Sequence, residues 1–170
     1  MLEEGAKLYG YVQVGEEAYI GPYTRVYGPA TIGDYSRVEE FCLIGVEAAR
    51  KTSSEEQRFE TKIGEEVVIR SHTVVYAGCR IGSGCFVGHN ALLREHTVLG
   101  RNVVVGTASV LEGYCSVGDE TVMQSLVYVC RHAAIGRGVF IGPNTVFLND
   151  KHPPSKRLEA PVVEDEAVIG

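Results

Sequence analysis

The sequence predicts an all-β fold, a single-stranded parallel β-helix, and three observations support this prediction. Apolar residues recur every six positions along almost the whole chain. Small or β-branched residues recur four positions after each of them. Two polar segments interrupt the rhythm without changing it afterwards. Because successive side chains of a strand alternate between its two faces, both recurring residues can point inward.

The six-residue unit (hexad) sets the elements in order from Leu8 to Ile169. Its first position holds Ile, Val, Leu, Met or Phe, and its fifth is small or β-branched, as at Ala18, Thr24, Ala30, Ser36 and Cys42. Three hexads, 18 residues, predict one triangular coil, and neighbouring coils stack about 4.8 Å apart. Each coil buries the one beneath it, so the chain forms a three-faced rod.

One face is marked by glycine at the second position of its hexads and by charged or small outer residues. These hexads begin at Val14, Ile32, Ile63, Ile81, Leu99, Val117 and Ile135, and we expect them to face solvent. The two interruptions, at about 50–62 and 149–162, both precede this face. Two loops are therefore predicted at one corner, and loops on a rigid scaffold often line a functional site.

Composition narrows the functional class. The 170 residues predict a single domain, 1–170, and the net charge of −6 argues against nucleic acid as a partner. No apolar run could cross a membrane, and the acidic start does not resemble a signal peptide. The five cysteines include no CxxC pair, which favours a reduced, cytoplasmic location. Four of them, Cys42, Cys79, Cys85 and Cys115, occupy the fifth position and are expected to be buried; Cys130 occupies a second position and stays open.

The hexads of the third face carry a column of polar residues. Their fourth positions hold Gly78, His96, Tyr114, His132 and Asp150, and their third positions hold Ala77, Glu95, Gly113, Arg131 and Asn149. Residues 18 apart become neighbours in stacked coils, which predicts His132 beside Asp150 and Arg131 beside Asn149. Such a column is either a solvated surface or a catalytic site.

Acyl transfer needs a positioned nucleophile, a base and oxyanion donors. His132 oriented by Asp150, or His152 alone, is a candidate base, and Asn149 is a candidate for holding the acceptor or the oxyanion. We expect further residues to bind substrate: Arg131, Tyr114, His96, Glu95, His89 and Asn90.

The hexad pattern resembles the hexapeptide-repeat acyltransferases, which implies a left-handed β-helix and a homotrimer. The stretch IGPNTVFLNDKHPPSK is similar to a loop of the nucleotide-sugar N-acetyltransferases of surface-polysaccharide pathways, which implies that Asn149 lies at an active site between subunits. The galactoside and maltose acetyltransferase branch implies a catalytic role for His152, which precedes a proline. The chain departs from the first group at Arg131, where some members have a carboxylate, and at His152, where an aromatic residue is usual.

The resemblance favours an acetyl-CoA-dependent acetyltransferase acting on an amino group of a nucleotide-linked sugar. A sugar O-acetyltransferase and a non-catalytic β-helix scaffold are the alternatives. Lys156 and Arg157, with Lys151 nearby, are candidates for contact with the CoA phosphates. The sequence ends two residues into a hexad, and family members usually continue with coils that form part of the CoA site, so we expect such coils to be missing here.

A zinc site is the remaining alternative. The γ-class carbonic anhydrases share the fold and bind zinc through three histidines between subunits, two of them five residues apart. Here His89 and His96 are seven residues apart, and a spacing of five falls on Arg94. We therefore expect no metal, and we expect His72, His89 and Asn90 to line a subunit contact and help hold a substrate on the neighbour.

Overall fold

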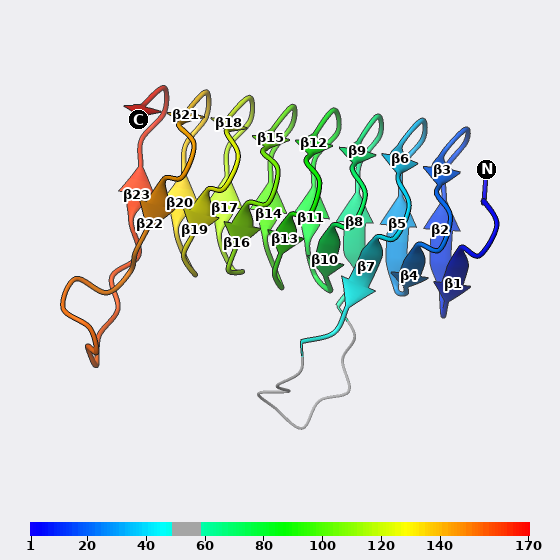
Figure 1. Cartoon of the computed structure of the whole chain (residues 1–170), viewed down its shortest axis with the longest axis horizontal. Coiled ribbons are helices and arrows are strands. Elements are labelled where there is room, and N and C mark those ends of the chain that lie inside the picture. The colour runs from blue at the N-terminus through cyan, green and yellow to red at the C-terminus, as the bar shows by residue number, and fades with distance from the viewer. Residues whose placement is uncertain (49–58) are drawn as a thin grey trace.

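The computed structural model describes residues 1–48 and 59–170 and is a left-handed parallel β-helix (Figure 1). Over these residues the chain forms short strands that pair into three parallel sheets, one along each face of the rod. The predicted fold class is confirmed. Within the described chain no helix is long and apolar enough to cross a membrane.

The three sheets are named after their first strands. The β1 sheet contains β1 (Lys7–Tyr9), β4 (Arg25–Tyr27), β7 (Leu43–Val46), β10 (Val74–Tyr76), β13 (Leu92–Leu93), β16 (Val110–Leu111), β19 (Tyr128–Val129) and β22 (Val146–Phe147). The β2 sheet contains β2 (Val12–Val14), β5 (Ala30–Ile32), β8 (Thr61–Ile63), β11 (Arg80–Ile81), β14 (Val98–Leu99), β17 (Ser116–Val117), β20 (Ala134–Ile135) and β23 (Val162–Val163). The β3 sheet contains β3 (Tyr19–Ile20), β6 (Arg37–Val38), β9 (Val68–Ile69), β12 (Phe86–Val87), β15 (Val104–Val105), β18 (Val122–Met123), β21 (Phe140–Ile141) and β24 (Val168–Ile169).

The register between strands is the predicted 18-residue step. Leu93 pairs with Leu111, and Leu111 pairs with Val129. The step lengthens only where an insertion intervenes, as in the pairing of Ile44 with Val75. First-position side chains therefore stack directly on one another along the axis, and they form one continuous core.

The fifth-position residues fill the inner corners, and all five cysteines are free and buried. Cys130, which the sequence left open, is only 2% exposed. Burial raises the pKa of the Cys42 thiol to about 11 and that of Cys79 to about 12. Because a buried, protonated thiol is a poor nucleophile, these cysteines act as small core residues.

Both insertions leave the rod between the β1 and β2 sheets, so the predicted shared corner is confirmed (Figure 1). The first connects β7 to β8, and residues 50–58 of the predicted 50–62 segment lie outside the described residues. Its predicted end overlaps strand β8, which begins at Thr61. The second occupies 148–161, and Val162 already belongs to β23. We call the edge formed by these insertions and the turns at 77–78, 95–96, 113–114 and 131–132 the loop corner.

Candidate functional site

Three stacked turns of the loop corner present ring side chains to the surface. His96, Tyr114 and His132 have left-handed φ angles of 57°, 52° and 67° and lie in the turns that lead the chain from the β1 sheet to the β2 sheet. Ring centroids lie 4.7 Å apart between His96 and Tyr114 and 5.5 Å apart between Tyr114 and His132. Phe59, where the described chain resumes after the first insertion, packs edge-on against His96 at 4.5 Å. These four rings form the ring ladder.

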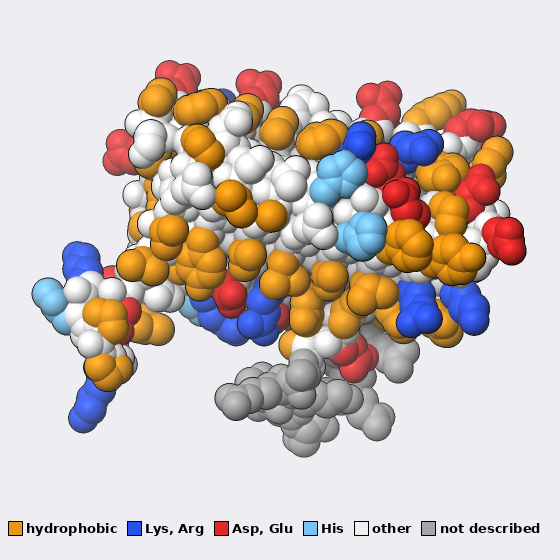
Figure 2. Space-filling view, in the orientation of Figure 1, with side chains coloured by type: hydrophobic (Ala, Val, Ile, Leu, Met, Phe, Trp, Pro, Cys, Tyr) orange, Lys and Arg blue, Asp and Glu red, His pale blue; other side chains and the backbone are white. Residues whose placement is uncertain are grey.

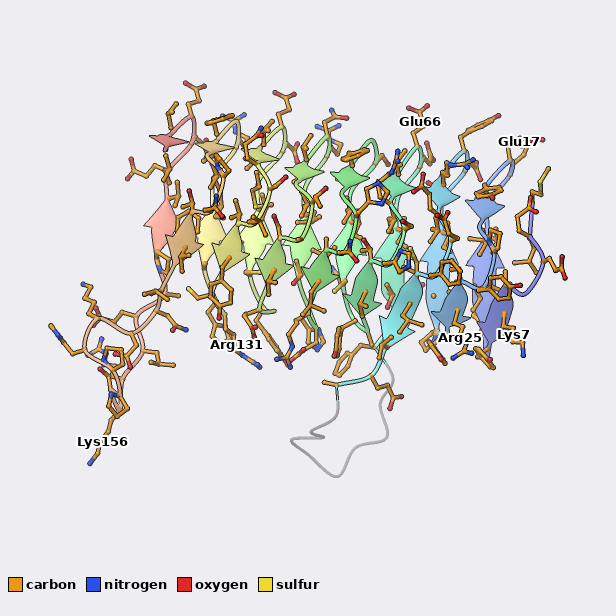
Figure 3. All side chains as sticks on the ribbon, in the orientation of Figure 1. Lys7, Glu17, Arg25, Glu66, Arg131 and Lys156 are labelled. Carbon is orange, nitrogen blue, oxygen red and sulfur yellow. The ribbon has the colours of Figure 1, made fainter. Side chains whose placement is uncertain are left out.

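An ion-pair network runs beside the ring ladder. Glu95 contacts the Arg94 guanidinium at 3.0 Å and the Arg131 guanidinium at 3.3 Å, and its side chain is only 13% exposed. Arg94 also contacts Glu112 at 3.3 Å. The Arg131 guanidinium lies 4.2 Å from the centre of the Tyr114 ring, a cation–π geometry. Arg131 is therefore held by the ion pair with Glu95 and by the contact with the Tyr114 ring. It lies on the loop-bearing edge of the rod (Figure 3).

His96 lies in the middle of this arrangement and is half-buried. Burial lowers the pKa of its imidazole, with a further lowering from Arg131, while Glu95 acts in the opposite direction. An imidazole with a pKa below its usual 6.5 is neutral at pH 7. His96 is therefore suited to hydrogen bonding with a ligand rather than to carrying a charge.

Asn149 joins the second insertion to the rod. Its side-chain Nδ2 donates to the carbonyl oxygen of Arg131 at 3.4 Å, so the predicted proximity of these residues is confirmed. Its own carbonyl oxygen accepts from the backbone N–H of Glu159 at 2.8 Å, which closes the neck of the loop. Asn149 is thus fixed both to the coil below and to the segment of the insertion that returns to the rod.

The expected pairing of His132 with Asp150 is wrong. Among the described residues, the Asp150 carboxylate accepts from the backbone N–H of His152 at 3.0 Å, from the N–H of Ser155 at 2.8 Å and from the Ser155 hydroxyl at 2.5 Å. These bonds, led by those from Ser155, lower the pKa of Asp150. The physical reason is that the chain leaves the coil at residue 148, so Asp150 turns into the loop instead of continuing the column.

The imidazole of His152 is exposed, and the structure gives it no hydrogen-bond partner among the described residues. Lys151 and Arg157 each lie 3.7 Å from the carboxylate of Glu159, and so share one counter-charge. Lys156 lies at the outer end of the loop, away from the rod (Figure 3). The loop therefore presents one free imidazole and a cationic tip.

A second cluster lies at the corner between the β3 and β1 sheets, which we call the histidine corner. His89 Nδ1 lies 2.8 Å from the Ser71 hydroxyl, and His89 Nε2 lies 3.2 Å from Arg70 Nε, which also contacts Glu39 at 3.0 Å. In this arrangement Arg70 Nε donates to His89 Nε2, and His89 Nδ1 faces the Ser71 hydroxyl. Both ring nitrogens of His89 are therefore occupied by neighbours in the same chain.

Two further residues of the histidine corner are His72 and Asn90. His72 stacks on Phe41 at 5.1 Å, and Asn90 is exposed one coil above. Within one chain this corner and the loop corner lie on different edges, so His89 and Asn90 do not meet Asn149 or His132. The described residues contain no group of three His, Cys, Asp or Glu side chains placed to hold a metal ion.

Glu39, Arg70 and Phe59 contribute to these two corners and were not predicted from the sequence. Glu39 and Arg70 occupy second positions, where glycine is common on this face, and that departure was an available signal. Glu39 and Arg70 are 31 residues apart because the first insertion lies between their coils. A search for neighbours 18 residues apart therefore does not find this pair. Phe59 belongs to no hexad, so no periodic signal could place it.

The repeat matches the family model for bacterial transferase hexapeptide (six repeats) over residues 11–45 and 60–95. The two matched segments lie on either side of the first insertion. A curated relative is the bifunctional protein GlmU of Wolbachia pipientis wMel, 31% identical over 107 residues, which cover 54% of this chain and 25% of GlmU. The chain thus spans about a quarter of that relative's length.

Solved structures share the fold of this chain. The UDP-N-acetylglucosamine acyltransferase from Campylobacter jejuni superposes with a TM-score of 0.74 and 24% identity, covering 85% of this chain and 64% of that one. The Francisella novicida enzyme gives 0.76 and 17%, covering 86% and 62%. LpxA from Bacteroides fragilis 9343 gives 0.73 and 17%, covering 88% and 68%. At these identities the likeness establishes the rod architecture.

Proposed function

We propose that the protein is an acyltransferase that moves an acetyl group from acetyl-CoA to an amino group of a nucleotide-linked sugar, with its site at the loop corner. The observation that carries the proposal is the position of Asn149, locked between the Arg131 carbonyl and the neck of the loop. The exposed imidazoles of His152 and His132 lie on the same edge. The similar Campylobacter jejuni protein is a UDP-N-acetylglucosamine acyltransferase, which agrees with transfer to a nucleotide sugar.

The chain's own groups suit each step of the reaction. The acceptor nitrogen attacks the thioester carbonyl, a C–N bond forms, the C–S bond breaks, and CoA leaves as a thiol after taking a proton. The Asn149 amide orients the acceptor, and positioning alone contributes about 7–11 kcal/mol in well-oriented reactions. An exposed imidazole accepts the proton that the amine loses, a role that histidine commonly fills in catalysis. Lys156 and Arg157 approach the CoA phosphates.

Assembly into a homotrimer in the cytoplasm is part of the proposal. The outward rows of the β3 and β1 sheets are apolar in their central coils, and hydrophobic side chains extend along the face viewed in Figure 2. The rows contain Val68, Phe86, Val104, Val122 and Phe140 on one sheet, and Val74, Leu92, Val110, Tyr128 and Val146 on the other. The β2 sheet instead presents Lys62 and Arg80. Two apolar faces flanking one edge suit packing around a threefold axis.

Calorimetric titration of acetyl-CoA into the 170-residue protein tests the donor. We expect micromolar binding with one site per chain, followed by acetyl transfer when nucleotide-linked amino sugars are screened. A folded protein that binds no acetyl-CoA would contradict the proposed donor. Binding without transfer to any amino sugar would contradict the proposed acceptor.

Transfer to a sugar hydroxyl is the second candidate, and the free imidazole of His152 favours it. A hydroxyl must lose its proton as it attacks, so it depends more strongly on a base than an amine does. If the acceptor is an amine, Asn149→Ala should reduce kcat/KM more than His152→Ala does. If it is a hydroxyl, the order should reverse.

A further inference from the structure

The second insertion contains an internal clasp whose centre is a residue that the mechanism above does not use. Asp150 Oδ2 accepts from the backbone N–H of Ser155 at 2.8 Å, and Oδ1 accepts from the Ser155 hydroxyl at 2.5 Å. The same hydroxyl lies 2.9 Å from the carbonyl oxygen of His152. A hydroxyl has one proton to donate, and a carboxylate is the stronger acceptor. Ser155 and Asp150 are therefore bound to one another through both backbone and side chain.

The clasp encloses the candidate base. His152 lies between the two clasp residues, and its backbone N–H donates to Asp150 Oδ1 at 3.0 Å. Pro153 and Pro154 follow it and restrict the backbone further, because proline fixes φ and limits the residue before it. The main chain of His152 is thus held while its imidazole stays exposed.

The clasp also acts on Asn149, which immediately precedes Asp150. Asn149 is fixed on its other side by the Arg131 carbonyl and by Glu159. The clasp consequently holds the backbone that joins Asn149 to His152. The two side chains therefore project from a fixed stretch of main chain.

We propose that Ser155 is a positioning residue, which with Asp150 clasps the loop so that His152 and Asn149 face the acceptor together. This inference rests on the proposed function. It gives Asp150 a role different from that of a carboxylate orienting a catalytic histidine: Asp150 acts on the loop backbone, and it does so through Ser155.

A double-mutant cycle of Asp150→Ala, Ser155→Ala and the double variant tests the coupling. We expect each single variant to lower kcat for acetyl transfer to a nucleotide-linked amino sugar by about 10- to 100-fold, the effect of a small misplacement of reacting groups. The affinity for acetyl-CoA measured by calorimetry should stay unchanged. The double variant should be no worse than the worse single variant, because residues acting as one unit are not additive. Ser155→Thr keeps the hydroxyl and should restore most of kcat.

Ser116→Ala is the matched control, since Ser116 is an exposed serine on β17 of the β2 sheet. It should leave kcat unchanged. Normal kcat in Ser155→Ala alongside a strong loss in Asp150→Ala would overturn the inference, because Asp150 would then act without Ser155. Additive losses in the double variant would overturn it as well.

Amide hydrogen exchange separates failure of the clasp from failure of the proposed function. The N–H groups of His152 and Ser155 should be protected in the wild-type protein and should exchange rapidly in Asp150→Ala. Rapid exchange in the wild-type protein would overturn the clasp whatever the activity. Protected amides in a protein that transfers no acetyl group would overturn the proposed function, and with it the positioning role of Ser155.

Discussion

Leu111 offers the sharpest test of the stacked core. It is fully buried on β16 and pairs with Leu93 below and Val129 above. Leu111→Ala removes three carbon groups, worth about 0.8 kcal/mol each, or about 2.4 kcal/mol in transfer free energy. The coils on both sides are held by their own hydrogen bonds and cannot close the space, so a cavity cost is added. We expect the free energy of unfolding to fall by about 3–5 kcal/mol.

Leu8→Ala is the matched control because it makes the same change at the same hexad position of the same sheet. Leu8 on β1 is 37% exposed and pairs with Val26 alone. About two thirds of the transfer term applies, and no enclosed cavity forms, so we expect a loss of about 1.5 kcal/mol.

Urea unfolding followed by circular dichroism, at one fixed protein concentration, measures both variants. Amide hydrogen exchange should place the loss in Leu111→Ala in the coils adjoining β16, since each coil contacts only its neighbours. Equal losses in the two variants, or a loss below about 1 kcal/mol for Leu111→Ala, would refute the stacked-core reasoning.

Three further predictions address the surface, the thiols and pH. Phe86→Asp on the apolar row of the β3 sheet should convert the proposed trimer to monomers, as measured by multi-angle light scattering. Val98→Asp on the β2 sheet, where the side chain is similarly exposed, should leave the mass unchanged. An unchanged mass for Phe86→Asp would contradict the proposed contact face. Iodoacetamide should label Cys42 and Cys79 only after unfolding, because burial raises the pKa of both thiols; rapid labelling of the native protein, read by mass spectrometry, would argue against this. The pKa of His96 is lowered in the folded state, so the unfolded state binds more protons and stability should fall as the pH drops below about 6.5. Thermal unfolding at a series of pH values should show a smaller fall for His96→Gln, and an identical fall would contradict the assignment.

The hexad rhythm determined most of what the sequence could predict. A large residue such as Leu111 and a small one such as Cys115 alternate at fixed intervals, and only one register buries both. The strand register, the core residues and the corner at which the insertions leave the rod could all be predicted from that constraint. Three of the four rings of the ring ladder, His96, Tyr114 and His132, followed too, because stacking makes residues 18 apart neighbours.

The remainder depended on segments without a period. A period of six continues the column through Asp150, but the chain leaves the coil before that residue, and the hydrogen bonds from Ser155 to Asp150 form within the loop. The pairing of Glu39 with Arg70 spans an insertion and needs that insertion to be counted correctly. Handedness came only from the family resemblance, because a period of six fits either hand.

The spacing of the two insertions is counted in whole coils. Strands β7 and β22 are five steps apart in the β1 sheet, so the insertions are separated by about 24 Å along the rod at about 4.8 Å per coil. Removing residues 93–110 would delete one complete coil and join positions of matching type. The insertions would then approach by one step without rotating around the axis. The distance between the two insertions can therefore change only in steps of one coil. Evolution can lengthen or shorten it by duplicating or losing 18 residues at a time.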